Sequence, residues 1–104
     1  MSAADPTRAF RLDGRVAVVT GGRGALGSAI AHSLREAGLT VHAPGRESLD
    51  VADEHSVERF FEVLGPVDLL VNNAGITRDA STARMREADW DAVLDVNLRG
   101  AFLC

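Results

Sequence analysis

The stretch that decides the fold of this chain is RVAVVTGGRGALG, residues 15–27. It begins with RVAVVT (15–20), a continuous, mainly β-branched run of the kind that forms a parallel strand buried on both faces. A glycine-rich segment follows at once, and from Ala25 onward apolar residues recur at helical spacing until Gly38, which is typical of a helix C-terminus. A buried strand, a glycine turn and an amphipathic helix in direct succession predict the first unit of an α/β fold.

The glycine-rich segment TGGRGALG fits two dinucleotide-binding patterns. Gly22, Gly24 and Gly27 satisfy G-x-G-x-x-G, and the longer pattern T-G-x-x-x-G-x-G, begun at Thr20, fits except for Ala25 at its middle glycine. Backbone N–H groups at the start of the following helix can bind a pyrophosphate, and side chains there would obstruct its approach. A tight turn without a ligand is the alternative, which the strand-to-helix context disfavours.

The rest of the chain alternates predicted strands and helices. We expect strands at 39–43, about 48–51 and 67–71, and helices at 53–64 and from about Glu87 to Cys104. The link between the second and third strands is too short for a crossover helix, so only a turn is expected there. This order predicts an α/β fold, a Rossmann-type parallel sheet with helices on both faces, truncated after about four strands.

The domain organisation follows from the same pattern. Residues 1–13 are expected to be a flexible N-terminal segment, and 14–104 a partial dinucleotide-binding (Rossmann) domain. Neither glycine nor proline follows Phe102, so the last helix is expected to be cut within its length.

Composition narrows the classes of function. The 104 residues carry a net charge of −4 without a basic cluster, which argues against nucleic acid or an anionic membrane as partner. Neither a signal-peptide core nor a membrane-spanning run is present, and Cys104 is the single cysteine, so we expect a cytoplasmic protein with no metal site. All eleven basic residues are arginine, and tyrosine is absent as well as lysine. A mechanism that needs a Tyr or Lys side chain is therefore closed to these residues alone.

A second candidate site lies in VNNAG, residues 71–75, at the carboxyl end of a predicted strand. Open α/β sheets bind ligands at this edge, where asparagine amides can tie loops together and Ala74-Gly75 lets a ribose approach the backbone. The tetrapeptide alone is equally compatible with a simple turn.

Three further polar residues are candidates with open alternatives. Arg46 lies about twenty residues after the glycine segment, where an arginine favours a 2′-phosphate, although a solvated pair with the adjacent Glu47 is the alternative. Asp50 can accept a hydrogen bond from an adenine amino group or merely shape a turn. Asn97 is disfavoured within a helix and can mark a kink or position an amide, but spacing alone favours a solvated or interhelical position.

In order and spacing, TGGRGALG, LDVAD (49–53), VDLLVNNAGITRD (67–79) and WDAVLDVNLRGAF (90–102) resemble the short-chain dehydrogenase/reductase family. The resemblance extends over nearly all of the chain from Gly14 onward. NNAGITRD followed by MREADWDAVLDVNLRG is most similar to the 3-oxoacyl-acyl-carrier-protein reductases of that family, enzymes of fatty acid biosynthesis.

The resemblance implies an NAD(P)-dependent oxidoreductase that reduces a ketone, such as a 3-oxoacyl thioester, with NADPH. Asn97 would be the catalytic asparagine, which helps to hold a water of the proton relay. Arg23 and Arg46 would favour NADP over NAD, and the full-length protein would be a homo-oligomer, a tetramer. The cofactor-binding residues would be Thr20, Gly21, Arg23, Gly24, Ala25, Leu26, Gly27, Arg46, Asp50, Val51, Asn72, Ala74 and Gly75.

The chain also departs from the family pattern. Ala25 replaces the middle glycine and adds a methyl group near the cofactor, while Arg23 stands one position earlier than the usual basic residue. The family's serine and Tyr-x-x-x-Lys pair are not found in these 104 residues. The chain alone is therefore expected to be inactive, and the alternative is a half-domain that binds a nucleotide or a partner without chemistry.

Overall fold

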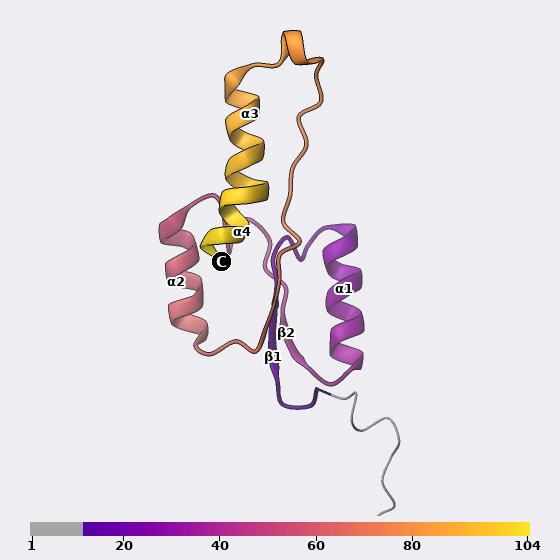
Figure 1. Cartoon of the computed structure of the whole chain (residues 1–104). Coiled ribbons are helices and arrows are strands. Elements are labelled where there is room, and N and C mark those ends of the chain that lie inside the picture. Colours follow the sequence, from indigo (N-terminus) through magenta and orange to yellow (C-terminus); the bar gives the residue numbers. More distant parts are fainter. Residues whose placement is uncertain (1–11) are drawn as a thin grey trace, which may run out of the picture.

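The computed structural model describes residues 12–104 and shows a three-stranded parallel sheet between two helical layers (Figure 1). The strands are β1 (Val16–Val19), β2 (Thr40–His42) and β3 (Leu69–Val71), in the order β2-β1-β3. Ala17 of β1 lies opposite Val41 on one side and Leu69 on the other. Most of the predicted N-terminal segment, residues 1–11, lies outside the described residues.

Helix α1 (Ala25–Glu36) covers one face of the sheet. Its Ala31 is fully buried against Ala17 and Val19 of β1, together with Leu39 and Val41. Because Ala17, Val18 and Val19 are all fully buried, the continuous apolar run is confirmed as a strand covered on both faces.

Helix α2 (Glu54–Leu64) lies on the opposite face of the sheet (Figure 1). Asp53 is its N-cap, and its carboxylate accepts a hydrogen bond of 3.0 Å from the His55 N–H. The helix ends at Gly65, whose φ of 85° is a conformation that favours glycine. Val57 of α2 packs with Leu49 and Val51 in a second apolar cluster.

The strand predicted at about 48–51 is wrong, so the sheet has three strands rather than four. Local turns satisfy the backbone there: the N–H groups of Ser48 and Leu49 both donate to the Gly45 carbonyl, and the Asp50 N–H donates to Ser56 Oγ at 2.9 Å. With these N–H groups engaged, they cannot join a ladder. The apolar residues of the segment are buried against α2 instead of in the sheet.

The C-terminal part is one long helix with a defect near its middle. It comprises α3 (Glu87–Leu94), a π-helical segment (Asp95–Arg99) and α4 (Gly100–Leu103), and a 3₁₀ turn (Thr82–Arg84) precedes it. Figure 1 shows α3 projecting beyond the sheet beside the loop that follows β3.

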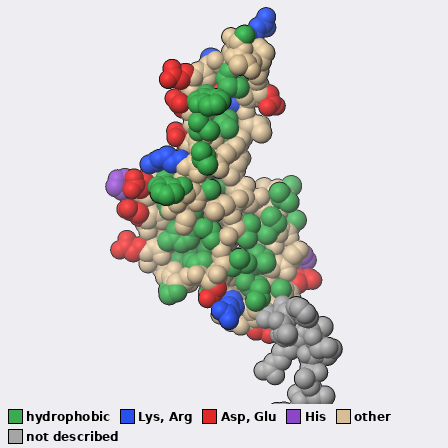
Figure 2. Space-filling model, viewed as in Figure 1, with side chains coloured by type: hydrophobic (Ala, Val, Ile, Leu, Met, Phe, Trp, Pro, Cys, Tyr) green, Lys and Arg blue, Asp and Glu red, His purple; other side chains and the backbone are tan. Residues whose placement is uncertain are grey.

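The C-terminal end of this long helix, α4, packs against the segment that precedes α2. Gly100 is buried, and a Cβ at this position would lie 2.7 Å from Val51 Cγ2. Along α3 and beyond, four apolar side chains are between 37% and 84% exposed: Trp90, Leu94, Leu98 and Phe102. Figure 2 shows hydrophobic side chains gathered along α3, so this helix carries an exposed apolar face.

Candidate functional site

The glycine turn after β1 is shaped by close backbone packing. Gly21 has a φ of 62°, and a Cβ there would lie 2.9 Å from the Ala74 Cα. Gly27 is buried, and its Cβ would collide with the Gly21 carbonyl oxygen and approach Asn73 Nδ2 to 2.6 Å. At Gly24, by contrast, a Cβ would meet only the Gly21 carbonyl at an ordinary 3.6 Å. Gly22 is buried and constrained as well, because a Cβ there would lie 2.5 Å from both the carbonyl carbon and the Cβ of Ala43. Gly21, Gly22 and Gly27 therefore have no room for a side chain, whereas Gly24 does.

The first turn of α1 leaves its N–H groups available to a ligand. Its N-cap is Gly24, so no side chain caps the helix, and its first turn contains no acidic residue. The N-terminus of α2 differs on both counts, because Asp53 caps it and Glu54 lies in its first turn. Free N–H groups at the positive end of a helix dipole suit a pyrophosphate. Ala25 and Leu26 are exposed in this turn, so the methyl group of Ala25 points away from the packed core.

Thr20 and Asn73 tie the glycine turn to the loop after β3. The Thr20 hydroxyl oxygen accepts hydrogen bonds from the backbone N–H groups of Asn73 (3.1 Å) and Ala74 (3.0 Å). The Asn73 side-chain amide in turn donates to the carbonyls of Thr20 and Gly21, both at 3.1 Å. These bonds hold the two loops together. Because Thr20 is only 1% exposed, its side chain can support cofactor binding only by positioning the loops.

Asn97 ties the π-helical segment to the same loop. Its Oδ1 accepts from the Ile76 N–H at 2.8 Å, and its Nδ2 donates to the Ile76 carbonyl at 2.9 Å. The Gly100 N–H reaches the Asp95 carbonyl five residues earlier, which is the π-type bond of the segment. The structure thus combines a helix irregularity with a positioned amide, whereas spacing alone had favoured a merely solvated or interhelical asparagine.

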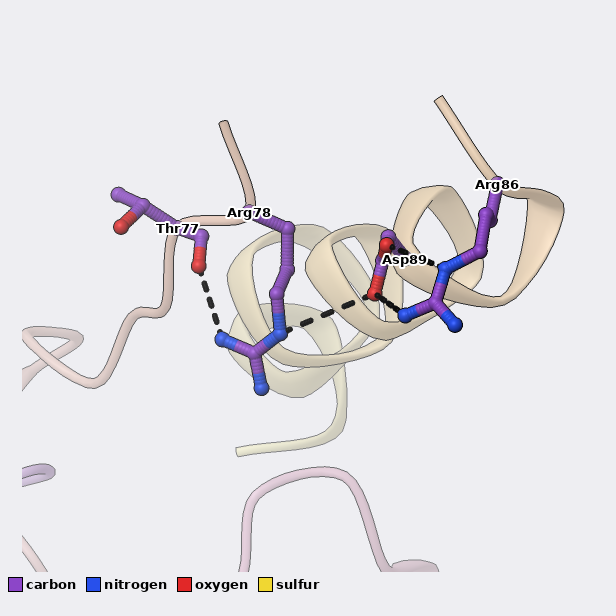
Figure 3. A network of polar contacts seen from close by, with 4 residues as sticks. All are labelled: Thr77, Arg78, Arg86 and Asp89. Carbon is purple, nitrogen blue, oxygen red and sulfur yellow. Dashed lines mark hydrogen bonds and ion pairs between the residues drawn. The ribbon is translucent and has the colours of Figure 1, made fainter. Parts of the chain in front are cut away.

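A cluster of charges holds the next residues of this loop against α3 (Figure 3). Asp89 accepts two hydrogen bonds from Arg86, at 3.2 and 3.3 Å, and its Oδ1 lies 4.0 Å from Arg78 Nε. Arg78 also donates to the Thr77 carbonyl at 2.8 Å. The loop is therefore attached to the long helix at two neighbouring points, Ile76 and Arg78.

A cavity of about 320 Å³ lies between the glycine turn, the loop after β3 and the long helix. Six of the predicted cofactor-binding residues line it: Gly21, Arg46, Asp50, Val51, Ala74 and Gly75. Asn97 lines an adjoining open hollow with Gly75 and Ile76. A larger hollow of about 640 Å³ between β2 and α2 contains none of the predicted residues, so the smaller cavity is the candidate site.

The two predicted specificity arginines lie near carboxylates. Arg23 Nη1 donates to Glu47 Oε1 at 3.1 Å, and Arg46 Nε lies 3.7 Å from Asp50 Oδ2. A solvated pair of Arg46 with Glu47 was the alternative that the sequence left open, and in the structure Glu47 pairs with Arg23 instead. Asp50 also shapes the local turn, because its Oδ1 accepts from the Ala52 N–H at 3.1 Å.

Within residues 12–104, no group of three or more His, Cys, Asp and Glu side chains is placed to hold a metal ion. No helix in that range is long and apolar enough to cross a membrane. Burial raises the pKa of the Cys104 thiol above its ordinary value, because desolvation disfavours the thiolate.

The parallel sheet, the glycine turn and the uncapped helix define this chain as a Rossmann-type α/β protein. A family model described as short chain dehydrogenase matches residues 47–104, which is more than half of the chain. The chain belongs to the short chain dehydrogenase family, as the resemblance of its motifs predicted.

Individual relatives agree with this assignment. The chain is 38% identical to the 3-oxoacyl-[acyl-carrier-protein] reductase of Thermotoga maritima, with 89% of this chain and 48% of the relative covered. It is 39% identical to the acetoacetyl-CoA reductase of Cupriavidus necator, with 85% and 46% covered. The chain thus spans about half the length of the curated relatives it matches.

Solved structures show the same fold. A putative 2-deoxy-D-gluconate 3-dehydrogenase from Agrobacterium tumefaciens with bound NADP superimposes with a TM-score of 0.81 at 36% identity, covering 92% of this chain and 46% of that one. For a gluconate 5-dehydrogenase from Burkholderia cenocepacia in complex with NADP and tartrate, the TM-score is 0.75 at 32% identity, with 89% and 46% covered.

Sequence reasoning missed two residues of this region. Asn73 joins the two loops through its side chain, whereas the predicted Asn72 is exposed and makes no side-chain hydrogen bond within residues 12–104. Arg78 lines the cavity although only its place in NNAGITRD had been noted. Two adjacent asparagines look alike in a sequence, and only their directions relative to the glycine turn distinguish them.

Proposed function

We propose that this chain binds a dinucleotide, NADP in preference to NAD, along the carboxyl edge of its sheet. The observation that carries the proposal is the uncapped first turn of α1, which lies next to Gly21 at the edge of the cavity. The positive helix end and the close backbone approach at Gly21 and Gly27 suit a pyrophosphate. The two solved neighbours described with NADP support the choice of cofactor.

The other residues have distinct roles in this proposal. Asp50 and Val51, which line the cavity, would contact the adenine, and Ala74 with Gly75 would lie against a ribose. Exposed Asn72 would contribute its free amide at the same end. The guanidinium groups of Arg23 and Arg46 would bind the 2′-phosphate, which distinguishes NADP from NAD.

For the reaction, we propose the reduction of a ketone, such as a 3-oxoacyl thioester, by a protein of which this chain is the cofactor-binding part. A bound nicotinamide cofactor supplies the hydride, and the ketone oxygen must gain a proton. Asn97 lies beside Gly75, where its double hydrogen bond to Ile76 fixes the loop at the reacting end. The resemblance assigns proton donation to a tyrosine, and these 104 residues contain neither tyrosine nor lysine.

Binding can be tested with a charge placed in the first turn of α1. Ala25→Asp sets a carboxylate beside the proposed pyrophosphate at an exposed helical position, so NADPH affinity should fall at least tenfold while the far-UV circular dichroism stays unchanged. Ala29→Asp, one turn further along the exposed side of α1, is the matched control and should bind NADPH like the parent chain. Equal affinities for both variants and the parent would contradict the proposed site.

Catalysis needs a separate test. The purified chain is expected to give no turnover of acetoacetyl thioesters with NADPH above background, and measurable turnover would refute the need for the tyrosine and lysine. We propose a cytoplasmic location and a tetrameric full-length protein, both as extensions of the family resemblance.

The exposed apolar face on the long helix favours a second candidate function, a half-domain that pairs with another chain. Trp90 and Leu98 are 56% and 68% exposed, and Leu94 between them is 37% exposed; an exposed row of large apolar side chains often marks an interaction surface. Size-exclusion chromatography combined with NADPH titration separates the candidates. A soluble monomer that binds NADPH supports a nucleotide-binding module, whereas stable association without NADPH binding supports partner binding.

A further inference from the structure

Gly100 of the long helix packs against one wall of the candidate cavity. It is buried in α4, and a Cβ built on it would lie 2.7 Å from Val51 Cγ2, 3.0 Å from Val51 Cβ and 3.2 Å from the Val51 carbonyl oxygen. Val51 also lines the cavity of about 320 Å³. A side chain of the cavity wall therefore lies directly against a helical position that has no side chain of its own.

Val51 has little freedom to move deeper into the protein. It is 6% exposed and belongs to one apolar cluster with Leu49 and Val57, which are 3% and 5% exposed. Phe60 and Leu103 pack against the same cluster. Because these side chains fill the interior around Val51, a displaced Val51 side chain has room only on the side of the cavity.

The helix around Gly100 is held on both sides of this position. Three residues earlier, the Asn97 side chain makes two hydrogen bonds to the backbone of Ile76, at 2.8 and 2.9 Å. Three residues later, Leu103 packs against the apolar cluster that contains Val51. A methyl group at position 100 would therefore push Val51 toward the cavity more readily than it would lift α4 away.

We infer that Gly100 is a positioning residue for the adenine end of the dinucleotide. This inference rests on the proposed function, which places the adenine against Asp50 and Val51. Because Gly100 has no side chain, Val51 lies back against α4 and leaves that end of the cavity wide enough for a flat aromatic ring. A side chain at position 100 narrows the adenine end without touching the ligand. The rest of the cavity, lined by Gly21 and Gly75, is not part of this contact.

The test measures the affinities for NADPH and for its adenine half, adenosine 2′,5′-bisphosphate, by titration calorimetry. Gly100→Ala should raise both Kd values by the same factor, about fivefold or more, because overpacking by one methyl group displaces Val51. The far-UV circular dichroism should stay unchanged, since alanine favours a helix. A role in folding alone would change Tm but leave the Kd values of the folded chain as they are in the parent.

A second substitution turns this comparison into a double-mutant cycle. In the parent chain, Val51→Ala removes apolar contact with the adenine and should weaken NADPH binding roughly two- to fivefold. In the Gly100→Ala background, it removes Cγ2, the atom nearest to the new methyl group, and should tighten NADPH binding instead. Val63→Ala removes the same two methyl groups from an 83% exposed position on α2 and should change the Kd by less than about twofold in either background.

Unchanged Kd values in Gly100→Ala, or weaker binding on adding Val51→Ala in both backgrounds, would overturn the inference while leaving the dinucleotide site intact. If Gly100→Ala does not fold, the double variant still tests the contact, because it should bind NADPH like Val51→Ala alone. Markedly weaker binding by the double variant, or its failure to fold, would overturn the inference. If the parent chain binds neither NADPH nor the bisphosphate, the proposed function fails, and the inference fails with it.

Discussion

Replacing Asn73 with alanine tests how the two loops of the site are held together. The Asn73 amide donates to the carbonyls of Thr20 and Gly21, which lie more than fifty residues earlier in the chain. Its removal leaves the Thr20 carbonyl without this donor, whereas the Gly21 carbonyl still accepts from the Gly24 N–H at 3.2 Å. The unsatisfied Thr20 carbonyl should therefore cost more free energy than the Gly21 carbonyl.

The expected magnitude follows from these two bonds. A hydrogen bond contributes about 0.5–1.5 kcal/mol net, and a partly buried carbonyl left without a partner costs about 1–3 kcal/mol. We expect Asn73→Ala to lower the free energy of unfolding by about 2 kcal/mol, a roughly 30-fold change in the unfolding constant. For a domain of this size, this corresponds to a fall in Tm of about 8–16 °C.

The neighbouring asparagine provides a matched control. Asn72 is exposed and makes no side-chain hydrogen bond in the described part of the chain, so Asn72→Ala should change the free energy of unfolding by less than about 0.5 kcal/mol. Urea unfolding followed by far-UV circular dichroism measures both variants, provided that each shows a single transition with the same m-value. In NADPH titration, Asn72→Ala should weaken binding even though it leaves the free energy of unfolding nearly unchanged.

The reasoning is refuted if Asn72→Ala destabilises the chain as much as Asn73→Ala does. The same conclusion holds if Asn73→Ala changes the free energy of unfolding by less than about 0.5 kcal/mol, since the two loops would then be held by other contacts.

Three further predictions concern the same region. Gly27→Ala should destabilise the chain by about 1–3 kcal/mol and abolish NADPH binding, because the added Cβ has no room. Gly24→Ala should fold normally, because its Cβ meets no atom closer than 3.6 Å. Equal Tm values for the two variants would contradict this difference. Asn97→Ala should speed hydrogen exchange of the Ile76 amide about tenfold, because the side-chain oxygen that accepts from it is lost. Unchanged exchange, measured by NMR, would show that this bond does not protect the amide. At pH 7.5 the Cys104 thiol should react with iodoacetamide more slowly in the folded chain than in urea, because its raised pKa lowers the thiolate fraction. The difference in rate should shrink as the pH rises through that pKa. Equal rates in the folded and unfolded chain at pH 7.5 would contradict the raised pKa.

Most of the fold could be predicted from local patterns. The strand, glycine turn and helix of residues 15–36 were confirmed because a buried β-branched run and a 3.6-residue apolar period leave few alternatives. The caps of α2 at Asp53 and Gly65 likewise depend on local sequence, since each meets a local backbone requirement. The error at 48–51 arose where a short apolar segment is buried by α2 instead of by neighbouring strands, and periodicity does not distinguish these two environments.

The candidate site was predicted in part. Backbone-driven positions such as Gly21 and Gly27 follow from the motif, because the absence of a side chain is itself a sequence feature. Side-chain partners did not follow: Asn73 rather than Asn72 joins the loops, and Arg23 rather than Arg46 pairs with Glu47. These choices depend on the direction of a side chain across a gap of 24 to 53 residues.

The sequence by itself thus determined the family, the succession of strand, glycine turn and helix at residues 15–36, and the edge of the sheet at which the glycine turn lies. These properties depend on spacing along the chain, which a linear pattern records. The tertiary structure decided that β1 lies between β2 and β3, that Asn97 hydrogen-bonds to Ile76, and that Glu47 pairs with Arg23. Such contacts join segments brought together by packing, so the distance and direction that create them exist only in the folded chain.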